Sequence, residues 1–386
     1  MISRPLLALL TAAAAASAHA GPHPPAPEGG LYLGADLSYV NEMEDCGAVY
    51  RKAGKPVDPF QLLQAEGGNI VRVRIWNDAT WTKYSDYDDV LKTIRRAQAA
   101  GMQVLLNFHY SDDWADGGKQ IAPVAWAKLD EDAQARALHD YTRDILTRLN
   151  AAGAMPEMVQ VGNETNPELL GGKVPGDPIN WKRNAKLLNA GIRAVREVGA
   201  TASVNPRVML HIAQPEYVIK WFDDATAAGV RDYDLIGISY YSKWSKWSLS
   251  QLKWAIATSK ARYAKDVILV EAGYPFTLKP ADTATNLLGT EALIKGYPAT
   301  PAGQRKFMID LTQLVVDAGG IGTVYWEPYW VSTRCGTRWG KGSDWENSAW
   351  FDYRRTNALP VFEWLRHDYR RTAPPELKTV AKGERG

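Results

Sequence analysis

Residues 88–110 read DDVLKTIRRAQAAGMQVLLNFHY, a helical pattern that passes through one glycine into a strand pattern. Apolar residues in the first part recur every three or four positions, as on one face of an α-helix. Gly101 stands where a helix ends, because glycine takes the left-handed conformation there without steric cost. The apolar run after it is of the length and type that form a strand. Residues 88–110 are therefore predicted to form a helix followed by a strand.

The same alternation of strand and helix continues in both directions along the chain. Strands are predicted at 31–38, 69–76, 102–110, 158–164, 207–213, 235–241, 266–274 and 320–327. Helices are predicted at 58–66, 88–100, 130–152, 181–199, 217–228, 249–264, 300–318 and 358–369. Eight alternating units of this size favour an α/β fold with a single (β/α)8 barrel over a doubly wound sheet. The GxGxxG turn of a dinucleotide-binding fold does not follow the first strand.

The composition is that of a globular chain with balanced charge. Its 386 residues carry 45 Lys and Arg against 43 Asp and Glu, a formal net charge of +2. Proteins that bind nucleic acids usually concentrate a basic surplus on one face, so this class is disfavoured. The unusual feature is 15 Trp against 7 Phe. Because the indole ring has a large flat apolar face and a polar N–H, this surplus suggests stacking on sugar rings.

The N-terminal segment has the pattern of a secretory signal peptide, which we assign to residues 1–20. Arg4 is its lone charge, residues 6–16 are apolar, and Ala18-His19-Ala20 is a small-x-small cleavage site. The apolar run is too short to span a membrane. We therefore expect an exported protein, secreted or periplasmic, with no membrane partner. Residues 21–30 are predicted to be a flexible lead-in, 31–373 the barrel and 374–386 a polar tail.

Polar and aromatic side chains end the predicted strands, where the active sites of (β/α)8 barrels lie. They are Asp36, Arg74, Trp76, His109, Asn163, Glu164, His211, Tyr241, Glu271 and Trp326. A buried charge costs several kcal/mol unless it is paired, so a barrel built only for stability would end its strands in small or apolar residues. Glu164 and Glu271 form a carboxylate pair of the kind that glycosidic-bond hydrolysis requires. Each of them taken alone could equally be a salt-bridged barrel residue.

Motifs along residues 31–360 resemble glycoside hydrolase family 53, the endo-β-1,4-galactanases. The N-terminal ones are GADLS at 34–38, EMED at 42–45, FHYSDDWAD at 108–116 and GKQ at 118–120. The later ones are VQVGNE at 159–164, SYY at 239–241, EAGYP at 271–275, YWEP at 325–328 and WENSAWFD at 345–352. The motif at 108–116 is highly specific for this family.

The resemblance implies a retaining clan A hydrolase that cuts internal β-1,4-galactosyl linkages in the (arabino)galactan side chains of pectin. By motif match, Glu164 would be the general acid/base and Glu271 the nucleophile of a double displacement. The acid then needs a raised pKa, while the nucleophile stays ionised beside a cation. Side chains alternate along a strand, which puts Arg72 and Arg74 on the inner face of the second one. We expect Arg74 to be that cation, and the deeper Arg72 to be a buried ion-pair partner.

Aromatic and polar residues near the strand ends are expected to bind the substrate. Asn163 is placed to hold the sugar 2-hydroxyl, and Trp326 to form a floor under the sugar at the scissile bond. Trp114 is expected to stack on a neighbouring sugar whose hydroxyls bond Asp112. Further tryptophans expected on this face, in keeping with an open cleft and endo action, are Trp76, Trp244, Trp247, Trp330, Trp339, Trp345 and Trp350.

Histidine and tyrosine side chains are further candidates. His109 and His211 are expected to bond carboxylates or sugar hydroxyls, although a lone histidine is often purely structural. Tyr241 is expected to donate a hydrogen bond to Glu271 and keep it ionised. Tyr240 competes for this role, and strand parity alone does not choose between the two.

The two cysteines, Cys46 and Cys335, follow the first and the eighth predicted strands. These strands are neighbours in a closed barrel, so we predict a Cys46–Cys335 disulfide that fixes the last loop. No cofactor and no metal are predicted. The loop at 277–299 holds only Asp282 and Glu291 as acids, whereas calcium takes six to eight oxygen ligands.

Two other functions stay open. One is the same reaction on another β-1,4-linked polysaccharide such as mannan or glucan, which the barrel and the two glutamates alone would allow. The other is a non-catalytic carbohydrate-binding barrel. In each case the expected partner is a polysaccharide, and the protein is expected to be a monomer.

Overall fold

The computed structural model describes residues 23–172, 177–337 and 340–371. The predicted signal peptide at 1–20 and the polar tail at 374–386 lie outside the described residues. Within the described residues, no helix has the length and apolar character needed to cross a membrane.

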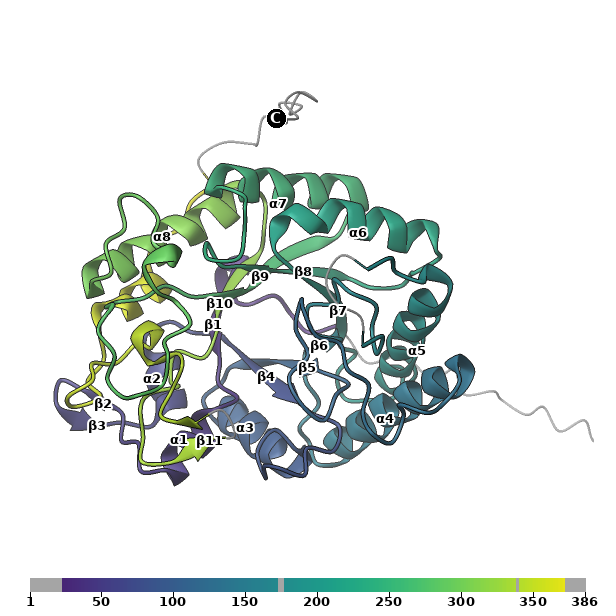
Figure 1. Cartoon of the computed structure of the whole chain (residues 1–386), viewed down its shortest axis with the longest axis horizontal. Coiled ribbons are helices and arrows are strands. Elements are labelled where there is room, and N and C mark those ends of the chain that lie inside the picture. Colours follow the sequence, from purple (N-terminus) through teal and green to yellow (C-terminus); the bar gives the residue numbers. More distant parts are fainter. Residues whose placement is uncertain (1–22, 173–176, 338–339, 372–386) are drawn as a thin grey trace, which may run out of the picture.

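Eight parallel strands form a closed barrel in the order β1-β10-β9-β8-β7-β6-β5-β4 (Figure 1). They are β1 (Tyr32–Asp36), β4 (Ile70–Ile75), β5 (Gln103–Phe108), β6 (Met158–Val161), β7 (Arg207–Ala213), β8 (Leu235–Tyr240), β9 (Asp266–Ala272) and β10 (Gly322–Tyr325). Each matches a predicted strand. The register pairs Ala35 of β1 with both Tyr325 and Val71, which closes the barrel between its first and last strands. The predicted (β/α)8 fold is confirmed.

Helices surround this barrel (Figure 1). They are α1 (Val40–Asp45), α2 (Pro59–Ala65), α3 (Tyr87–Ala99), α4 (Glu131–Ala151), α5 (Trp181–Gly199), α6 (Pro215–Ala227), α7 (Leu249–Tyr263) and α8 (Pro301–Asp317). Shorter elements are the hairpins β2 (Arg51–Lys52) with β3 (Lys55–Pro56) and β11 (Gly336–Thr337) with β12 (Gly340–Lys341). The 3-10 helices are η1 (Glu28–Gly30), η2 (Thr290–Ala292), η3 (Glu346–Ser348) and η4 (Pro360–Arg366).

The helix predicted at 358–369 is wrong, because this segment forms the 3-10 helix η4 instead. Its buried side chains are Val361, Phe362, Trp364 and Leu365. They fall into two rows with a spacing of three residues, which is the repeat of a 3-10 helix. The apolar pattern predicted the buried face correctly but not the type of helix.

The core has two parts, and their arrangement leaves one end of the barrel polar. Apolar residues between strands and helices form the larger part. Inside the barrel, a smaller cluster fills the space with Tyr32, Ile70, Leu105, Met158, Met209, Leu235, Ile268, Val270 and Val324. Most of these lie at the beginnings or middles of their strands. The C-terminal ends are thus left to polar side chains, as is usual in this fold.

The predicted disulfide is present between Cys46, directly after α1, and Cys335, directly before β11. The two Cα atoms are 5.6 Å apart. The bridge joins the loop after β1 to the long loop after β10, since these strands are neighbours in the barrel.

Candidate active site

A cavity of about 990 Å³ opens at the C-terminal ends of the barrel strands. All eight strands, or the residues just after them, contribute to its wall. These residues include Asp36, Arg72, Arg74, His109, Asn163, Glu164, Ala213, Tyr241, Glu271 and Trp326. The cavity therefore lies where the barrel architecture predicts an active site.

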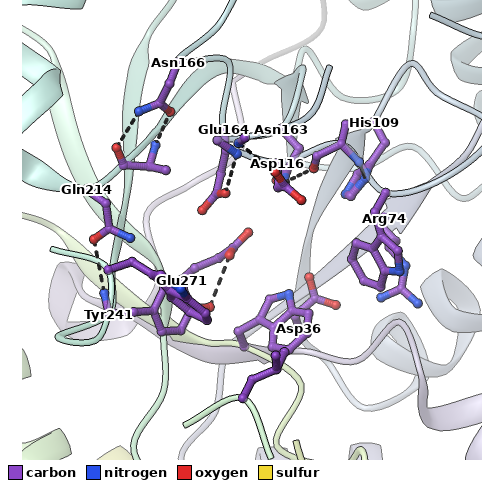
Figure 2. Close-up of a pocket in the computed structure, with 18 of the residues that line it drawn as sticks. Asp36, Arg74, His109, Asp116, Asn163, Glu164, Asn166, Gln214, Tyr241 and Glu271 are labelled. Carbon is purple, nitrogen blue, oxygen red and sulfur yellow. Dashed lines mark hydrogen bonds between the residues drawn. The ribbon is translucent and has the colours of Figure 1, made fainter. Parts of the chain in front are cut away.

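Glu164 and Glu271 lie together in this cavity (Figure 2). Glu271 belongs to β9, whereas Glu164 follows the end of β6 by three residues and has a positive φ of 45°. One carboxylate oxygen of Glu164 and one of Glu271 lie within 4.8 Å of each other. Retaining glycosidases hold their carboxyl groups roughly 5–5.5 Å apart and inverting ones roughly 6.5–9.5 Å apart. The close approach of these two oxygens is in keeping with the shorter of the two spacings.

The environment of Glu164 favours its protonated form. Burial, followed by the nearby charge of Glu271, raises the pKa of Glu164 to about 8. Hydrogen bonds from the Ser239 side chain and from the Gly117 N–H, 3.0 Å from Oε2, oppose this rise but do not cancel it. No ion pair of Glu164 with a cationic side chain occurs among the described residues. Glu164 thus carries a proton near neutral pH, as a general acid must.

Glu271 has partners that favour its ionised form. Arg72 Nη1 lies 2.7 Å from Glu271 Oε1, and Tyr241 Oη donates to Oε2 at 3.2 Å. Burial, together with the charge of Asp36, raises the pKa of Glu271 above its usual value, and the charge of Arg72 and the hydrogen bonds from Arg72 and Tyr241 limit this rise. Of the two carboxyl groups, Glu271 is therefore the one that stays a carboxylate.

The expectation that Arg74 neighbours Glu271 is wrong, because Arg72 takes this place. Arg74 Nη1 instead pairs with Glu327 Oε1 at 2.5 Å, and its guanidinium lies over the rings of Tyr39 and Trp114. The predicted alternation was right, since both arginines point into the barrel. Alternation along a strand does not predict which acidic residue each guanidinium reaches across the barrel.

The structure also separates the two tyrosine candidates. The hydroxyl of Tyr241 donates to Glu271, whereas that of Tyr240 donates to the Trp247 carbonyl at 3.3 Å. Tyr241 lines the cavity, directly after the end of β8.

Asn163 lines the cavity and is tied to the barrel interior. Its Oδ1 accepts from Arg72 Nη2 at 2.7 Å, and its Nδ2 donates to the Ala115 carbonyl at 2.7 Å. The amide nitrogen carries two hydrogens, and in the described part of the chain only the Ala115 carbonyl accepts from it, so one N–H is left for a ligand. The loop at residues 115–117 therefore positions both Asn163, through the Ala115 carbonyl, and its neighbour Glu164, through the Gly117 N–H.

The two histidines differ in position. His109 lines the cavity, and its Nδ1 accepts the Ala115 N–H at 3.3 Å. His211 is not part of the cavity wall. Its Nδ1 lies 3.0 Å from Gln160 Nε2 and 3.3 Å from the Glu164 backbone nitrogen, and its Nε2 lies 2.8 Å from Ser239 Oγ.

The contacts of His211 indicate that it supports the Glu164 loop and does not contact sugar. Burial, with the charges of nearby arginines, lowers the pKa of both rings well below the usual value. Both rings are therefore neutral, and His109 carries its proton on Nε2.

The donor atoms of Glu164, His211 and Glu271 all lie within 4.8 Å of one another, close enough to hold an ion. However, both ring nitrogens of His211 already have hydrogen-bond partners, and Arg72 already neutralises Glu271. The arrangement therefore fits two carboxyl groups in different environments better than a metal centre.

Five tryptophans line the cavity: Trp114, Trp244, Trp326, Trp330 and Trp345. The ring of Trp326 packs edge-to-face on Trp345 at 4.6 Å between centroids and tilts against Trp114 at 6.0 Å. Of the other tryptophans expected on this face, Trp76, Trp247 and Trp350 do not line the cavity. Trp76 and Trp350 are buried, Trp247 packs against Trp254, and Trp339 lies outside the described residues.

The structure places Asp112 away from the cavity wall. Its Oδ1 accepts the Asp78 N–H at 3.0 Å, and its Oδ2 accepts the Val124 N–H at 2.8 Å. Asp112 therefore stabilises the surrounding loops through backbone N–H groups. The prediction that it bonds sugar hydroxyls is wrong.

Several residues around the site were not among the predicted ones. Asp116, Asn166 and Gln214 line the cavity, and Glu327 holds Arg74. Gln214 is the first residue after a predicted strand and Glu327 is the last residue of another. A position at the end of a predicted strand, or directly after it, is the sequence signal that marks these two residues.

Comparisons with known proteins show which family this chain is similar to. A family model described as Glycosyl hydrolase family 53 matches residues 32–365. The arabinogalactan endo-β-1,4-galactanase of Cellvibrio japonicus (strain Ueda107) is 54% identical over 351 residues, 90% of this chain and 93% of that protein. The endo-β-1,4-galactanase of Bacillus subtilis (strain 168) is 34% identical, over 83% of this chain and 77% of that protein. The solved Ignisphaera aggregans GH53 catalytic domain superposes with a TM-score of 0.80 at 30% identity, over 90% of this chain and 99% of that one.

Proposed function

Since the chain belongs to glycosyl hydrolase family 53, we propose that it hydrolyses internal β-1,4-galactosidic linkages of galactan, with retention at the anomeric carbon. The observation that carries this proposal is the pair Glu164 and Glu271, close together but in opposite electrostatic environments. Acid-assisted nucleophilic displacement of a glycoside needs one protonated and one ionised carboxyl group close together.

In the first step, Glu271 attacks the anomeric carbon of the sugar above Trp326. A bond forms between this carbon and a Glu271 oxygen, the glycosidic C–O bond breaks, and Glu164 gives its proton to the departing oxygen. Arg72 and Tyr241 keep Glu271 ionised until it attacks. His109, with its proton on Nε2, and Asn163, with one N–H left, are placed to hold sugar hydroxyls.

In the second step, water attacks the anomeric carbon, Glu164 accepts the water proton, and Glu271 leaves as a carboxylate. The charge of Glu271 is one of the main causes of the raised pKa of Glu164. This charge is absent while Glu271 is esterified, so the pKa of Glu164 falls and the residue can act as a base. Glu164 thus changes from an acid to a base when Glu271 changes from a charged carboxylate to a neutral ester.

The cavity suits a neutral polymer. Its tryptophans offer flat apolar faces for pyranose rings, and the chain carries almost no net charge. We place the natural substrate in the (arabino)galactan side chains of pectin and the protein outside the cytoplasm, because residues 1–20 have the pattern of a signal peptide. The similarity to relatives named galactanases favours galactan over mannan or glucan. The intact carboxylate pair favours an enzyme over a binding protein.

The test is release of reducing ends from β-1,4-galactan, mannan and glucan by the wild type and by Glu164→Gln and Glu271→Gln. We expect the wild type to cleave galactan and both variants to cleave it much more slowly. NMR should show that the first product of the wild type is the β-anomer. Cleavage of mannan or glucan alone would remove the proposed substrate. A first product of inverted configuration would remove the double displacement.

A further inference from the structure

Gln214 has a backbone conformation that its side chain does not favour. It lies between the end of β7 and the start of α6, with φ 62° and ψ 131°. Glycine adopts such angles readily, whereas a residue with a Cβ is strained there. Strained residues of this kind concentrate at functional sites, because the surrounding structure must hold them in place.

The start of helix α6 does not account for a glutamine at this position. Six other helices begin after a residue whose side chain accepts an N–H of the first turn. These residues are Asp58, Asp86, Asp130, Asn180, Ser248 and Thr300. Gln214 occupies the same position before α6 but makes no such bond. Its side chain contributes nothing to the helix.

The side chain of Gln214 instead lines the active-site cavity, with 7% of the residue exposed (Figure 2). Its Oε1 accepts the backbone N–H of Tyr241 at 3.4 Å, and this fixes the orientation of the amide. Within the described ranges, its Nε2 has no hydrogen-bond partner. The amide therefore has two N–H groups that a ligand in the cavity can use.

Gln214 lies on the same wall as the acid/base. Its chain neighbour Ala213 packs against Gly117, whose N–H donates to Glu164 Oε2. The side chain of Asn166 ties this wall together, because it bonds both the N–H and the carbonyl of Ala213. In Figure 2, Asn166 and Gln214 lie on one side of the carboxylate pair, and His109 and Arg74 lie on the other.

The wall continues outward from Gln214 to exposed aromatic rings. The Tyr217 N–H donates to the Gln214 carbonyl, and the ring of Trp244 packs on that of Tyr241. Tyr217 and Trp244 line the cavity and are 52% and 44% exposed. Rings of this kind offer stacking faces to further sugars along the same path.

From this arrangement we propose that Gln214 binds the sugar on the leaving-group side of the scissile bond, with Nε2 donating to one of its hydroxyls. The inference rests on the proposed function, in which the sugar that reacts lies over Trp326 and Glu164 protonates the oxygen that departs. The departing chain then extends away from Trp326, along the cavity wall that carries Glu164. On that wall, Gln214 is a buried polar side chain whose amide nitrogen has no hydrogen-bond partner among the described residues.

The test uses two variants and two substrates. Gln214→Met keeps the length of the side chain and removes the donor, and Gln214→Gly also removes the backbone strain. The substrates are β-1,4-galactan and the 4-nitrophenyl glycoside of β-1,4-galactobiose, whose aryl leaving group has no sugar hydroxyls. We expect kcat/KM on galactan to fall about tenfold, the effect of one lost hydrogen bond, and to change less than about twofold on the aryl glycoside.

The pH profile separates a contact with substrate from an effect on Glu164. Loss of a contact leaves the alkaline limb of kcat/KM on galactan in place, whereas a disturbed Glu164 moves it. We also expect Gln214→Gly to unfold at or above the wild-type temperature. A shifted alkaline limb, equal losses on both substrates, or an unchanged rate on galactan would each overturn the inference. If the wild type itself fails to cleave galactan, the proposed function fails instead.

Discussion

Arg72 Nη1 lies 2.7 Å from Glu271 Oε1, with both side chains buried in the barrel. The same guanidinium group also contacts Asp36 at 3.0 Å and Asn163 at 2.7 Å. Arg72 therefore fixes Glu271, the proposed nucleophile, relative to Asn163, which precedes the proposed acid/base Glu164. A planar group with several donors in a fixed geometry is suited to this task, and a lysine ammonium group is not.

We predict that Arg72→Lys shifts the acidic limb of the kcat/KM profile to higher pH. Arg72 lowers the pKa of Glu271, so a weaker cation leaves that pKa higher and the nucleophile protonated over a wider range. The expected loss at neutral pH is roughly 10- to 100-fold, since hydrogen bonds to charged groups contribute about 1.5–3 kcal/mol. Rates on galactan between pH 4 and 9 provide the measurement.

Arg74→Lys is the matched control for this prediction. Arg74 pairs with Glu327 and packs on aromatic rings, so its replacement is expected to raise KM and leave the acidic limb in place. An acidic limb that moves in Arg74→Lys and stays in Arg72→Lys would contradict the assignment of the cation.

Tyr241→Phe and Tyr240→Phe form a second matched pair. Loss of the Tyr241 hydroxyl removes a donor to Glu271, and we expect kcat on galactan to fall roughly 10- to 100-fold, because hydrogen bonds to charged groups contribute about 1.5–3 kcal/mol. Tyr240→Phe removes only a bond to the Trp247 carbonyl, so kcat is expected to stay within about twofold. Equal effects of the two variants would argue against a role of Tyr241 at the nucleophile.

Glu164→Gln is expected to unfold at a higher temperature than the wild type at pH 7. The pKa of Glu164 is about 8 in the folded protein, whereas a free Glu has a pKa of about 4.3. Folding takes up a proton between these values, so this group destabilises the wild type as pH rises from about 4.3 to 8. Glutamine avoids this loss, which is on the order of a few kcal/mol.

Calorimetry at pH 4 and pH 7 tests this prediction. The difference in unfolding temperature between Glu164→Gln and the wild type should be small at pH 4 and clear at pH 7. A difference that does not change with pH would show that Glu164 is ionised in the folded protein.

Removal of the disulfide in Cys46→Ser/Cys335→Ser is expected to destabilise the protein by about 2–5 kcal/mol. The bridge joins two cysteines that are 289 positions apart in the sequence. Cys335 lies between Trp330 and Trp345, which both line the cavity, so the bridge anchors this part of the wall. KM for galactan should therefore rise as well. Thermal unfolding with and without reductant is the measurement, and a wild-type melting temperature that reductant leaves unchanged would be the contrary result.

Much of the fold and part of the site followed from local patterns. Alternation along residues 69–76 placed Arg72 and Arg74 inside the barrel, and the neighbouring first and last strands brought Cys46 and Cys335 together. The assignment of Arg74 to Glu271 was wrong, because strand alternation gives the face of a side chain and not its partner across the barrel. Asp112 was misplaced for a similar reason: a polar residue in a loop can satisfy backbone N–H groups or sugar hydroxyls, and sequence does not tell which.

By itself, the sequence determined the (β/α)8 barrel and the presence of Glu164 and Glu271 at its functional end, because hydrophobic periodicity is a local property. Only the tertiary structure decided how the two carboxylates differ. Glu271 contacts Arg72 and Tyr241, while Glu164 is buried and pairs with no cationic side chain of the described residues, and these differences arise from residues far apart in the chain. It also revealed the strained backbone of Gln214, since φ and ψ are fixed by packing around the residue and not by its identity.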